Sequence, residues 1–270
     1  MRKLAELIVL IKGGGEVASG IAHKLHRCHF RVCLTETDNP LAVSRGTTFS
    51  EAVFDGVKTI EGVTAELAST SPEDICTVWQ RGNIPVVKDP HTSLKKQLEP
   101  DVFVDAIMAK KNTDTRIADA PLVIGMGTGF YAGRDVHIVV ETSNSNNLGR
   151  LIFEGEAERD TGTPIAIGGL TKERVIWASQ RGIFTSNHEL GDRVAAGDIV
   201  GWVGKSPLAA PLSGILRGLI RSGVAVTKGC KLVEIDPLND RTVCYIIRDK
   251  MRTIAGGVLE AIMMKFNLGV

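Results

Sequence analysis

The first half of the chain alternates continuous apolar runs with stretches of helical periodicity. Residues 7–11 are apolar throughout, the pattern of a central parallel strand that is buried on both faces. From 16 to 28, Val17, Ile21 and Leu25 recur at helical spacing, and 30–36 is strand-like again. Further strands are expected at 57–61, 84–87, 102–105 and 122–124, with a helix from Ser71 to about Gln80. The alternation predicts an α/β fold, with a Rossmann-like parallel sheet over residues 1–135.

The second half has a β-rich texture and contains an internal repeat. The pattern G-x-x-V-x-x-G-x-x-[LV] occurs at 191–200 and again at 223–232. We expect a β-rich connecting segment over 136–173, a small β module of two similar halves over 174–237, and a final strand and helix over 238–270. One apolar face of that helix should pack back on another part of the chain; it comprises Met251, Ile254, Val258, Leu259 and Ile262.

Composition and charge narrow the classes of partner. The 32 Lys and Arg residues balance 31 Asp and Glu residues for a net charge of +1, which removes the global electrostatic argument for a nucleic-acid or anionic-membrane partner. No apolar run reaches the roughly 18 residues of a membrane-spanning helix. Glu6 interrupts the N-terminal apolar run and no convincing cleavage site follows, so the chain is interpreted as cytoplasmic. The five cysteines lack C-x-x-C spacing, so we expect neither a metal centre nor a disulfide framework.

The first strand runs into a glycine loop with the features of a dinucleotide-binding fingerprint. Gly13, Gly15 and Ala18 fit G-x-G-x-x-[GA], in which the glycines allow a tight turn and a close phosphate. Glu36 ends the next strand about 20 residues on, where an acid for ribose hydroxyls is expected. We therefore interpret Gly13, Gly14, Gly15 and Glu36 as cofactor-binding. The alternative is a tight turn that binds nothing.

A second glycine loop follows the strand at 122–124. No convincing helix follows it, so it is not another fingerprint. We interpret Gly125, Gly127 and Gly129 as a backbone anion nest that faces the first loop, and the alternative is a strained turn only.

Five polar residues near these loops are further candidates. Asp105 lies at a strand end and could face the carboxyl edge of the sheet, where ligands of open α/β sheets bind. Lys110 and Lys111 suit a phosphate, although a solvated lysine pair is the plain alternative. His137 is either a core histidine or a site residue, and Glu141 is the better candidate for an acid.

The repeat in the second half resembles the biotinyl/lipoyl-carrier module, a flattened barrel of two similar halves. In carriers, a hairpin between the halves presents a lysine flanked by methionines. Here that register holds Trp202 and Val203, and the nearby lysine is Lys205 without flanking methionines. The resemblance therefore implies the fold and argues against a swinging-arm cofactor.

A longer resemblance extends over almost the whole chain and points to the YqeB family, which is associated with selenium-dependent molybdenum hydroxylases. The matching stretches are 11–22, 35–36, 40–43, 49–53, 105–112, 125–133, 135–137, 141–142, 148–150, 210–220, 231–237, 249–250 and 254–261. The resemblance implies an accessory role in the maturation of such an enzyme. Two departures from the family pattern are Thr128, where a proline is usual, and 143–147, where an Arg-Gly-His-like stretch is usual.

Three functions remain open at this point. The first is an accessory protein that binds a cofactor such as NAD(P) or a molybdopterin dinucleotide and hands it on to a molybdenum hydroxylase or its maturation factors. The second is an NAD(P)-linked or selenium-transfer enzyme of the same pathway. The third is a non-catalytic docking scaffold. A homo-oligomer is compatible with each of them.

Overall fold

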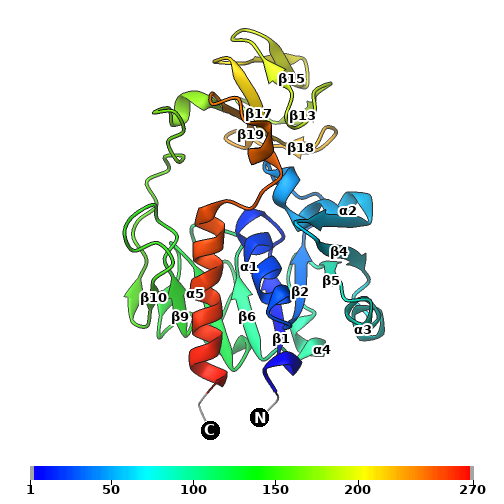
Figure 1. Ribbon diagram of the computed structural model, residues 1–270, viewed down its shortest axis with the longest axis vertical. Coiled ribbons are helices and arrows are strands. Elements are labelled where there is room, and N and C mark those ends of the chain that lie inside the picture. The colour runs from blue at the N-terminus through cyan, green and yellow to red at the C-terminus, as the bar shows by residue number, and fades with distance from the viewer. Residues whose placement is uncertain (1–2, 268–270) are drawn as a thin grey trace. The chain divides into compact units, whose positions relative to one another are not determined.

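The apolar runs of the N-terminal half pair into one nine-stranded sheet in the computed structural model, which describes residues 3–267 (Figure 1). The strand order is β10-β9-β7-β6-β1-β2-β5-β4-β3. The seven inner strands are parallel, and β3 and β10 pair antiparallel at the two edges. The strands are β1 (Ile8–Lys12), β2 (Arg31–Glu36), β3 (Val57–Ile60), β4 (Val63–Ala68), β5 (Ile84–Lys88), β6 (Val102–Asp105), β7 (Leu122–Met126), β9 (Ile138–Val140) and β10 (Leu151–Ile152).

Helices cover both faces of this sheet, which explains why its central strands are continuously apolar. On one face, α1 (Glu16–Arg27), α2 (Ala52–Asp55) and α5 (Asp249–Phe266) pack against residues such as Val9 and Ile11 of β1. On the other face, α3 (Pro72–Gln80) and α4 (Lys95–Leu98) pack against Leu10 and its neighbours. Ser71 caps α3 by accepting a hydrogen bond from the Asp74 amide, as the Ser-Pro start predicts.

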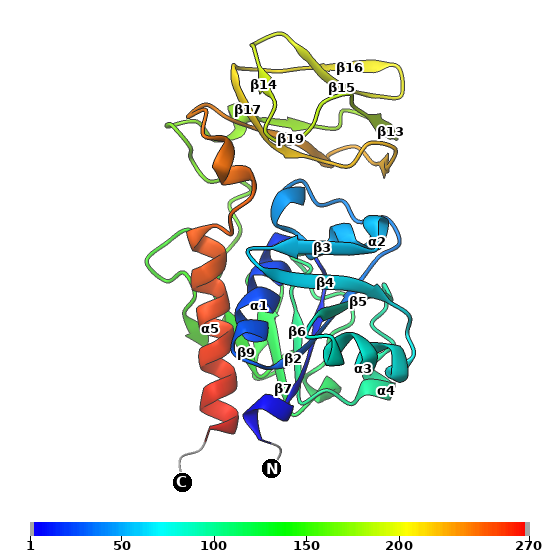
Figure 2. The same ribbon diagram turned by 45° about the vertical axis from the view of Figure 1, so that its right-hand side comes forward.

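Helices α1 and α5 lie side by side in both views (Figure 1 and Figure 2). Their close approach depends on glycine, because a Cβ on Gly20 would lie 2.8 Å from the Cβ of Met251. A Cβ on Gly257 would lie 2.3 Å from the carbonyl oxygen of Gly149, in the loop before β10. The buried face of α5 contains Met251, Ile254, Val258 and Ile262, with Leu259 partly buried.

The prediction of a strand just before α5 is wrong. Residues 241–244 form a 3₁₀ turn instead, which Asp240 caps by accepting a hydrogen bond from the Thr242 amide. Tyr245 and Ile246 are exposed, so the apolar character of this segment does not reflect a buried strand. Over so short a run, the pattern of apolar residues cannot distinguish a buried strand from an exposed turn.

Two antiparallel four-stranded sheets form the second half. Their orders are β12-β19-β17-β14 and β16-β15-β13-β18. The repeat in the sequence places β14–β15 and β18–β19 in equivalent positions of the two sheets, and a two-residue turn of Gly204 and Lys205 joins β15 to β16. The strands are β12 (Val175–Trp177), β13 (Gly182–Thr185), β14 (Arg193–Val194), β15 (Ile199–Val203), β16 (Ser206–Ala209), β17 (Gly214–Leu219), β18 (Ala225–Val226) and β19 (Lys231–Asp236).

The chain divides into two units at positions other than those expected from the sequence. The first comprises 1–40, 48–161 and 247–270, and the second comprises 41–47 and 162–246. Residues 136–161 belong to the first unit because β9 and β10 extend its sheet, while β11 (Gly155–Glu156) pairs with β8 (Tyr131–Ala132). Residues 41–47 belong to the second unit, where the carbonyl of Val43 accepts a hydrogen bond from the Leu219 amide. Across residues 3–267, the helices are all too short or too polar to cross a membrane.

The two adjacent glycines of α5 provide a test of this packing. Gly257→Ala should lower the free energy of unfolding by about 1–3 kcal/mol, because its Cβ would overlap the Gly149 carbonyl. Gly256→Ala should raise it by roughly 0.5–1 kcal/mol, since the nearest heavy atom lies 3.7 Å away and alanine favours a helix. Urea unfolding followed by circular dichroism measures both variants. Equal effects at the two positions would contradict the close contact of α5 with the loop at Gly149.

Candidate functional site

The order of strands reverses between β1 and β6. From β1 the chain builds outward through β2 on one side, and it then returns to place β6 and β7 on the other side. Ligands of open α/β sheets bind outside the carboxyl ends of the strands at such a switch point. Lys12 and Asp105 are paired in register there, and the first glycine loop leaves β1 at this edge.

Gly13 and Gly14 are held by close backbone packing. Gly13 has a φ of +103°, and a Cβ there would lie 3.1 Å from the side chain of Ile107. The amide of Gly14 donates to the Glu36 carboxylate at 2.8 Å. Its carbonyl accepts hydrogen bonds from the Ser50 amide at 3.0 Å and from the Ser19 hydroxyl at 2.9 Å. The loop is therefore fixed in one conformation.

Gly15 differs from its two neighbours because it faces open space. It is the N-cap of α1 with φ −68° and ψ −172°, and no heavy atom of residues 3–267 lies within 4 Å of the position of a Cβ. Glu16 and Val17 follow in the first helical turn, where the helix supplies no acceptor for the backbone N–H groups. The positive end of the helix dipole adds to their attraction for an anion.

The carboxylate of Glu16 does not oppose an anion at this turn as strongly as its sequence position suggests. Arg248, the N-cap residue of α5, forms an ion pair with it at 3.3 Å. The arginine neutralises the carboxylate next to the glycine loop.

Glu36 bends back onto the glycine loop. Besides the bond from Gly14, it accepts a hydrogen bond from the Thr37 amide at 2.7 Å. Burial raises the pKa of Glu36, against the lowering effect of these hydrogen bonds. Its contact with ribose hydroxyls stays a prediction, although the structure does place it beside Gly14.

A buried ionic cluster lies at the switch point. The ammonium of Lys12 contacts Asp105 at 3.2 Å, Thr113 at 2.9 Å and the carboxylate of Asp114. Thr115 also donates to Asp105 at 2.5 Å. Lys12 and Asp105 are 5% and 1% exposed, so their charges must compensate each other. The cluster attaches residues 113–115 to the ends of β1 and β6.

The loop after β6 lies between the two glycine loops. Ile107 fills the space beside Gly13, and a Cβ on Gly129 would lie 2.5 Å from the amide nitrogen of Lys111. Lys110 has a φ of +61° and forms an ion pair with Asp160. The backbone of the lysine pair therefore packs against the second glycine loop, and the Lys110 charge is already engaged by Asp160.

The structure gives the second glycine loop a packing role. A Cβ on Gly125 would lie 2.5 Å from the Phe130 ring, and one on Gly127 would lie 2.1 Å from the Thr142 hydroxyl. The Gly127 amide donates to the carbonyl of Val140. Close packing thus accounts for the glycines, while anion binding by this loop stays a prediction.

Glu141 organises the loops beyond β9. Its carboxylate accepts hydrogen bonds from the amides of Thr142, Ser143 and Glu158, each at 2.7 Å. A buried carboxylate with these partners holds the backbone of the surrounding loops in place. A role of Glu141 as a catalytic acid stays a prediction.

Residues at both departures from the family pattern form hydrogen bonds with Glu158. Thr128 donates to its carbonyl at 2.8 Å, and Ser145 and Asn147 donate to its carboxylate at 3.0 Å and 2.7 Å. These hydrogen bonds, first among them that of Asn147, lower the pKa of Glu158.

His137 fits the role of a satisfied structural histidine. Its Nδ1 accepts a hydrogen bond from the Val123 amide at 3.0 Å. Burial, and then the charge of Lys265, lowers the pKa of His137. The neutral ring is therefore the form that the fold favours.

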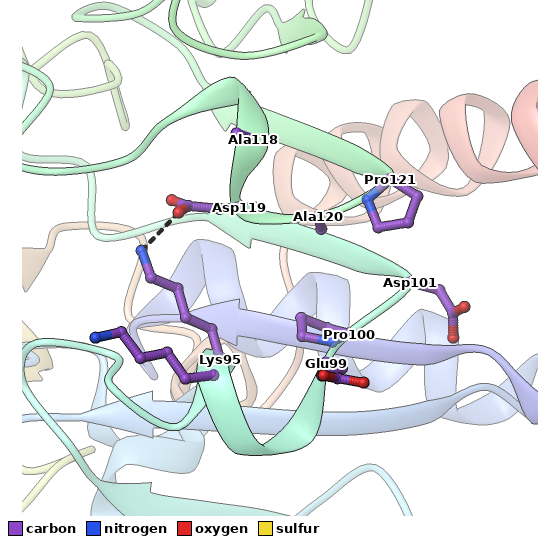
Figure 3. A pocket seen from close by; sticks show the side chains of 9 residues that line it. Lys95, Glu99, Pro100, Asp101, Ala118, Asp119, Ala120 and Pro121 are labelled. Carbon is purple, nitrogen blue, oxygen red and sulfur yellow. Dashed lines mark ion pairs between the residues drawn. The ribbon is translucent and has the colours of Figure 1, made fainter.

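No group of three metal-ligating side chains gathers anywhere in residues 3–267. An open pocket does occur at the opposite edge of the sheet, around Pro100 and Pro121 (Figure 3). Lys95 and Asp119 form an ion pair across it at 2.8 Å. None of the residues predicted from the sequence to bind a cofactor lines this pocket.

Sequence reasoning missed Lys12, Ser19 and Ser50. Lys12 has a signal in the sequence, because a lysine at the end of a buried strand needs a partner. Ser50 has none, since its contact with Gly14 joins segments far apart in the chain. Ser19 lies only five residues after Gly14, but no motif marks its hydroxyl as a partner of the loop.

No protein-family model matches the chain. Over 263 residues it is 45% identical to the uncharacterized protein YqeB of Escherichia coli (strain K12), an alignment that covers 97% of this chain and 48% of YqeB. The chain thus spans about half the length of the curated relative it matches. The identity supports the resemblance to the YqeB family drawn from the motifs.

Three solved structures show distant likenesses. The product-bound ectoine utilization protein EutE (DoeB) of Ruegeria pomeroyi is 13% identical, with 86% of this chain and 85% of that chain covered at a TM-score of 0.25. TcdA (CsdL) is 16% identical over 53% and 58% of the two chains, with a TM-score of 0.29. An aspartoacylase family protein of Mesorhizobium loti is 14% identical over 87% of each chain, with a TM-score of 0.28. Likenesses this weak carry no information about function.

The buried cluster predicts unequal effects for its members. Lys12→Met should cost about 3 kcal/mol of stability, because it leaves the carboxylate of Asp105 buried without its cation. Asp114→Asn should cost less than about 1 kcal/mol, since its side chain is 46% exposed and the charge is screened by water. Chemical denaturation of both variants measures the difference. A Lys12→Met protein as stable as Asp114→Asn would contradict the cluster.

Glu36 should make stability depend on pH in a defined direction. Its pKa is raised on folding, so the folded state binds the proton more tightly and ionisation of Glu36 destabilises the fold as pH rises through that pKa. Glu36→Gln should therefore be more stable than the wild type at pH 7, and the gain should vanish near pH 4, where the carboxyl is protonated in both states. Thermal melts between pH 4 and 8 test this. A less stable variant at pH 7 would show that hydrogen bonding outweighs burial.

Proposed function

We propose that the chain is an accessory protein for selenium-dependent molybdenum hydroxylases that binds a nucleotide or molybdopterin-type cofactor through a phosphate at the first glycine loop. The open position at Gly15, at the N-terminus of a 12-residue helix on the switch-point edge, carries the proposal. The hydroxylase pathway rests on the resemblance to the YqeB family. The proposal includes a Rossmann-like first unit and a carrier-like second unit.

A phosphate fits the exposed side of this loop. Gly14 is buried and its amide is engaged by Glu36, so a ligand meets Gly15 and the first turn of α1. The missing Cβ at Gly15 allows the backbone to approach a phosphate oxygen to hydrogen-bond distance. Arg248 removes the repulsion that Glu16 would exert on the same phosphate.

The side of the loop occupied by Glu36 suits the sugar of a nucleotide. Glu36 is half-buried, and its carboxylate can accept hydrogen bonds from ribose hydroxyls, which replace water as its partners. The ligand would extend from Glu36 across Gly15 toward the ends of β6 and β7. NAD(P) and a molybdopterin dinucleotide both have this sugar-phosphate arrangement.

The cysteines favour binding over selenium transfer, which needs an accessible thiolate. Burial raises the pKa of the Cys33, Cys230 and Cys244 thiols. Cys28 is exposed but follows the last residue of α1, about 18 Å along the helix from the glycine loop. Cys76 is exposed on α3, which covers the opposite face of the sheet. None of the five thiols combines exposure with a place at the loop.

A docking scaffold is the second candidate, and the surface of the second unit favours it. Large apolar side chains are exposed there, with Leu238 at 66%, Ile246 at 48% and Ile183 at 47%. Exposed apolar side chains mark a protein interaction surface where they form a contiguous patch, and such a patch is part of this second proposal. The partner would be a molybdenum hydroxylase or one of its maturation factors.

Substitution at Gly15 separates binding from folding. Gly15→Val should keep the fold, because φ −68° suits any residue and its Cβ enters open space. It should weaken nucleotide binding at least about tenfold, since the branched side chain holds the phosphate away from the backbone N–H groups. Calorimetric titration with NAD, CTP and a molybdopterin cytosine dinucleotide measures this, with Gly256→Ala as the control that should bind as the wild type does.

The outcomes distinguish the three candidate functions. Binding without turnover that Gly15→Val abolishes supports the accessory role. Turnover of a bound nucleotide supports the enzyme. If the wild type binds none of these compounds, the glycine loop is only a tight turn and the scaffold becomes the better explanation.

A further inference from the structure

The N-termini of α1 and α5 lie at the same edge of the sheet. Arg248, just before α5, contacts Glu16 at the start of α1, and Met251 packs against Gly20 one turn further along. The two helices run in the same direction from this edge (Figure 1 and Figure 2). Two helix dipoles therefore direct their positive ends toward one region.

Lys250 lies in the first turn of α5, where a cation is electrostatically unfavourable. Its side chain is half-buried, and among residues 3–267 no carboxylate lies within ion-pair distance of its ammonium. Burial lowers the pKa of Lys250 and Arg248 adds to this, while the charges of Glu16, Asp160 and Glu141 oppose it. Lys250 lies on the same face of α5 as Thr253 and Gly257, which contact the loop at Gly149 between β9 and β10. Two residues earlier, Arg248 contacts Glu16 beside the first glycine loop. These contacts place Lys250 at the edge of the sheet where the two loops lie.

An independent feature on the other side of the loop also points to a ligand. Ser50 is fully buried, and its hydroxyl has no hydrogen-bond partner in the part of the chain that the structure describes. Ser50 packs directly against the first glycine loop, because its Cα and its Cβ each lie 3.2 Å from the position of a Gly14 Cβ. Buried polar groups without a partner are rare and mark places where a polar group is missing.

We propose that Lys250 binds a second anionic group of the ligand, so that the ligand carries a diphosphate. This inference rests on the proposed function, in which the first turn of α1 binds one phosphate. A monophosphate would leave the Lys250 ammonium uncompensated, whereas a diphosphate supplies charge to both positive centres. The class of ligand is then a nucleoside diphosphate or a dinucleotide.

The test compares mono- and diphosphates of the same nucleoside. The wild type should bind ADP or CDP about 10- to 100-fold more tightly than AMP or CMP, the range for a charge-assisted hydrogen bond. Lys250→Met should remove most of this preference and leave monophosphate binding nearly unchanged, while Lys250→Arg should keep it. Lys265→Met, at the exposed far end of α5, is the matched control and should behave as the wild type does. Calorimetric titration of the full chain measures each pair, and circular dichroism verifies folding.

Three results would overturn the inference. If Lys250→Met binds both phosphates as the wild type does, or weakens both equally, Lys250 does not contact the second group and the proposed function still stands. If the wild type shows no preference for the diphosphate, the diphosphate class is wrong. If the wild type binds no nucleotide, this inference and the proposed function both fail.

Discussion

Close backbone packing at Gly14 is the constraint on which the candidate site depends. Its amide and carbonyl are both engaged, by Glu36 on one side and by Ser19 and Ser50 on the other. A Cβ at this position would lie 3.1 Å from the Glu36 carboxylate and 3.2 Å from the Ser50 backbone. These contacts hold Gly14 in place, so Gly15 and the start of α1 face outward in a defined orientation. Such preorganisation reduces the entropy cost of binding an anion.

Ion pairs compensate several of the charges at this edge. Lys12 is balanced by Asp105 and Asp114, Glu16 by Arg248, and Lys110 by Asp160. Lys250 has no ion pair within residues 3–267, and it carries the further inference because partial burial of a cation without an ion pair costs stability. Residues that break a local rule without a structural compensation tend to belong to functional sites. An anionic ligand would supply the compensation that the protein lacks.

The elements predicted best from the sequence are those with strong periodicity or a specific end signal. The continuous apolar run before Gly13 and the Ser-Pro start at Ser71 predict β1 and α3 almost to the residue. The strand expected before α5 is instead a 3₁₀ turn, because an apolar run of a few residues has no length from which to read a period. No local feature of the sequence shows that residues 41–47 belong to the second unit, since they pair with β17, more than a hundred residues away in the chain.

The candidate site could be predicted only in part. The glycine motif and the acid at Glu36 do come together, since both lie at the carboxyl ends of adjacent parallel strands. In the sequence, Glu141 is a candidate for a catalytic acid. In the structure its carboxylate accepts hydrogen bonds from backbone amides, and only the tertiary structure reveals this. The glycines at 125, 127 and 129 likewise make room for neighbouring groups, and sequence cannot distinguish that need from anion binding.

Amide chemical shifts test the central claim most directly. In a titration of the isotope-labelled chain with ADP or pyrophosphate, the N–H resonances of Gly15, Glu16 and Val17 should shift together and saturate. The Gly14 resonance should change less, because its amide remains bonded to Glu36. Shifts confined to Gly127 and Gly129, or no saturable shift at the start of α1, would contradict the account.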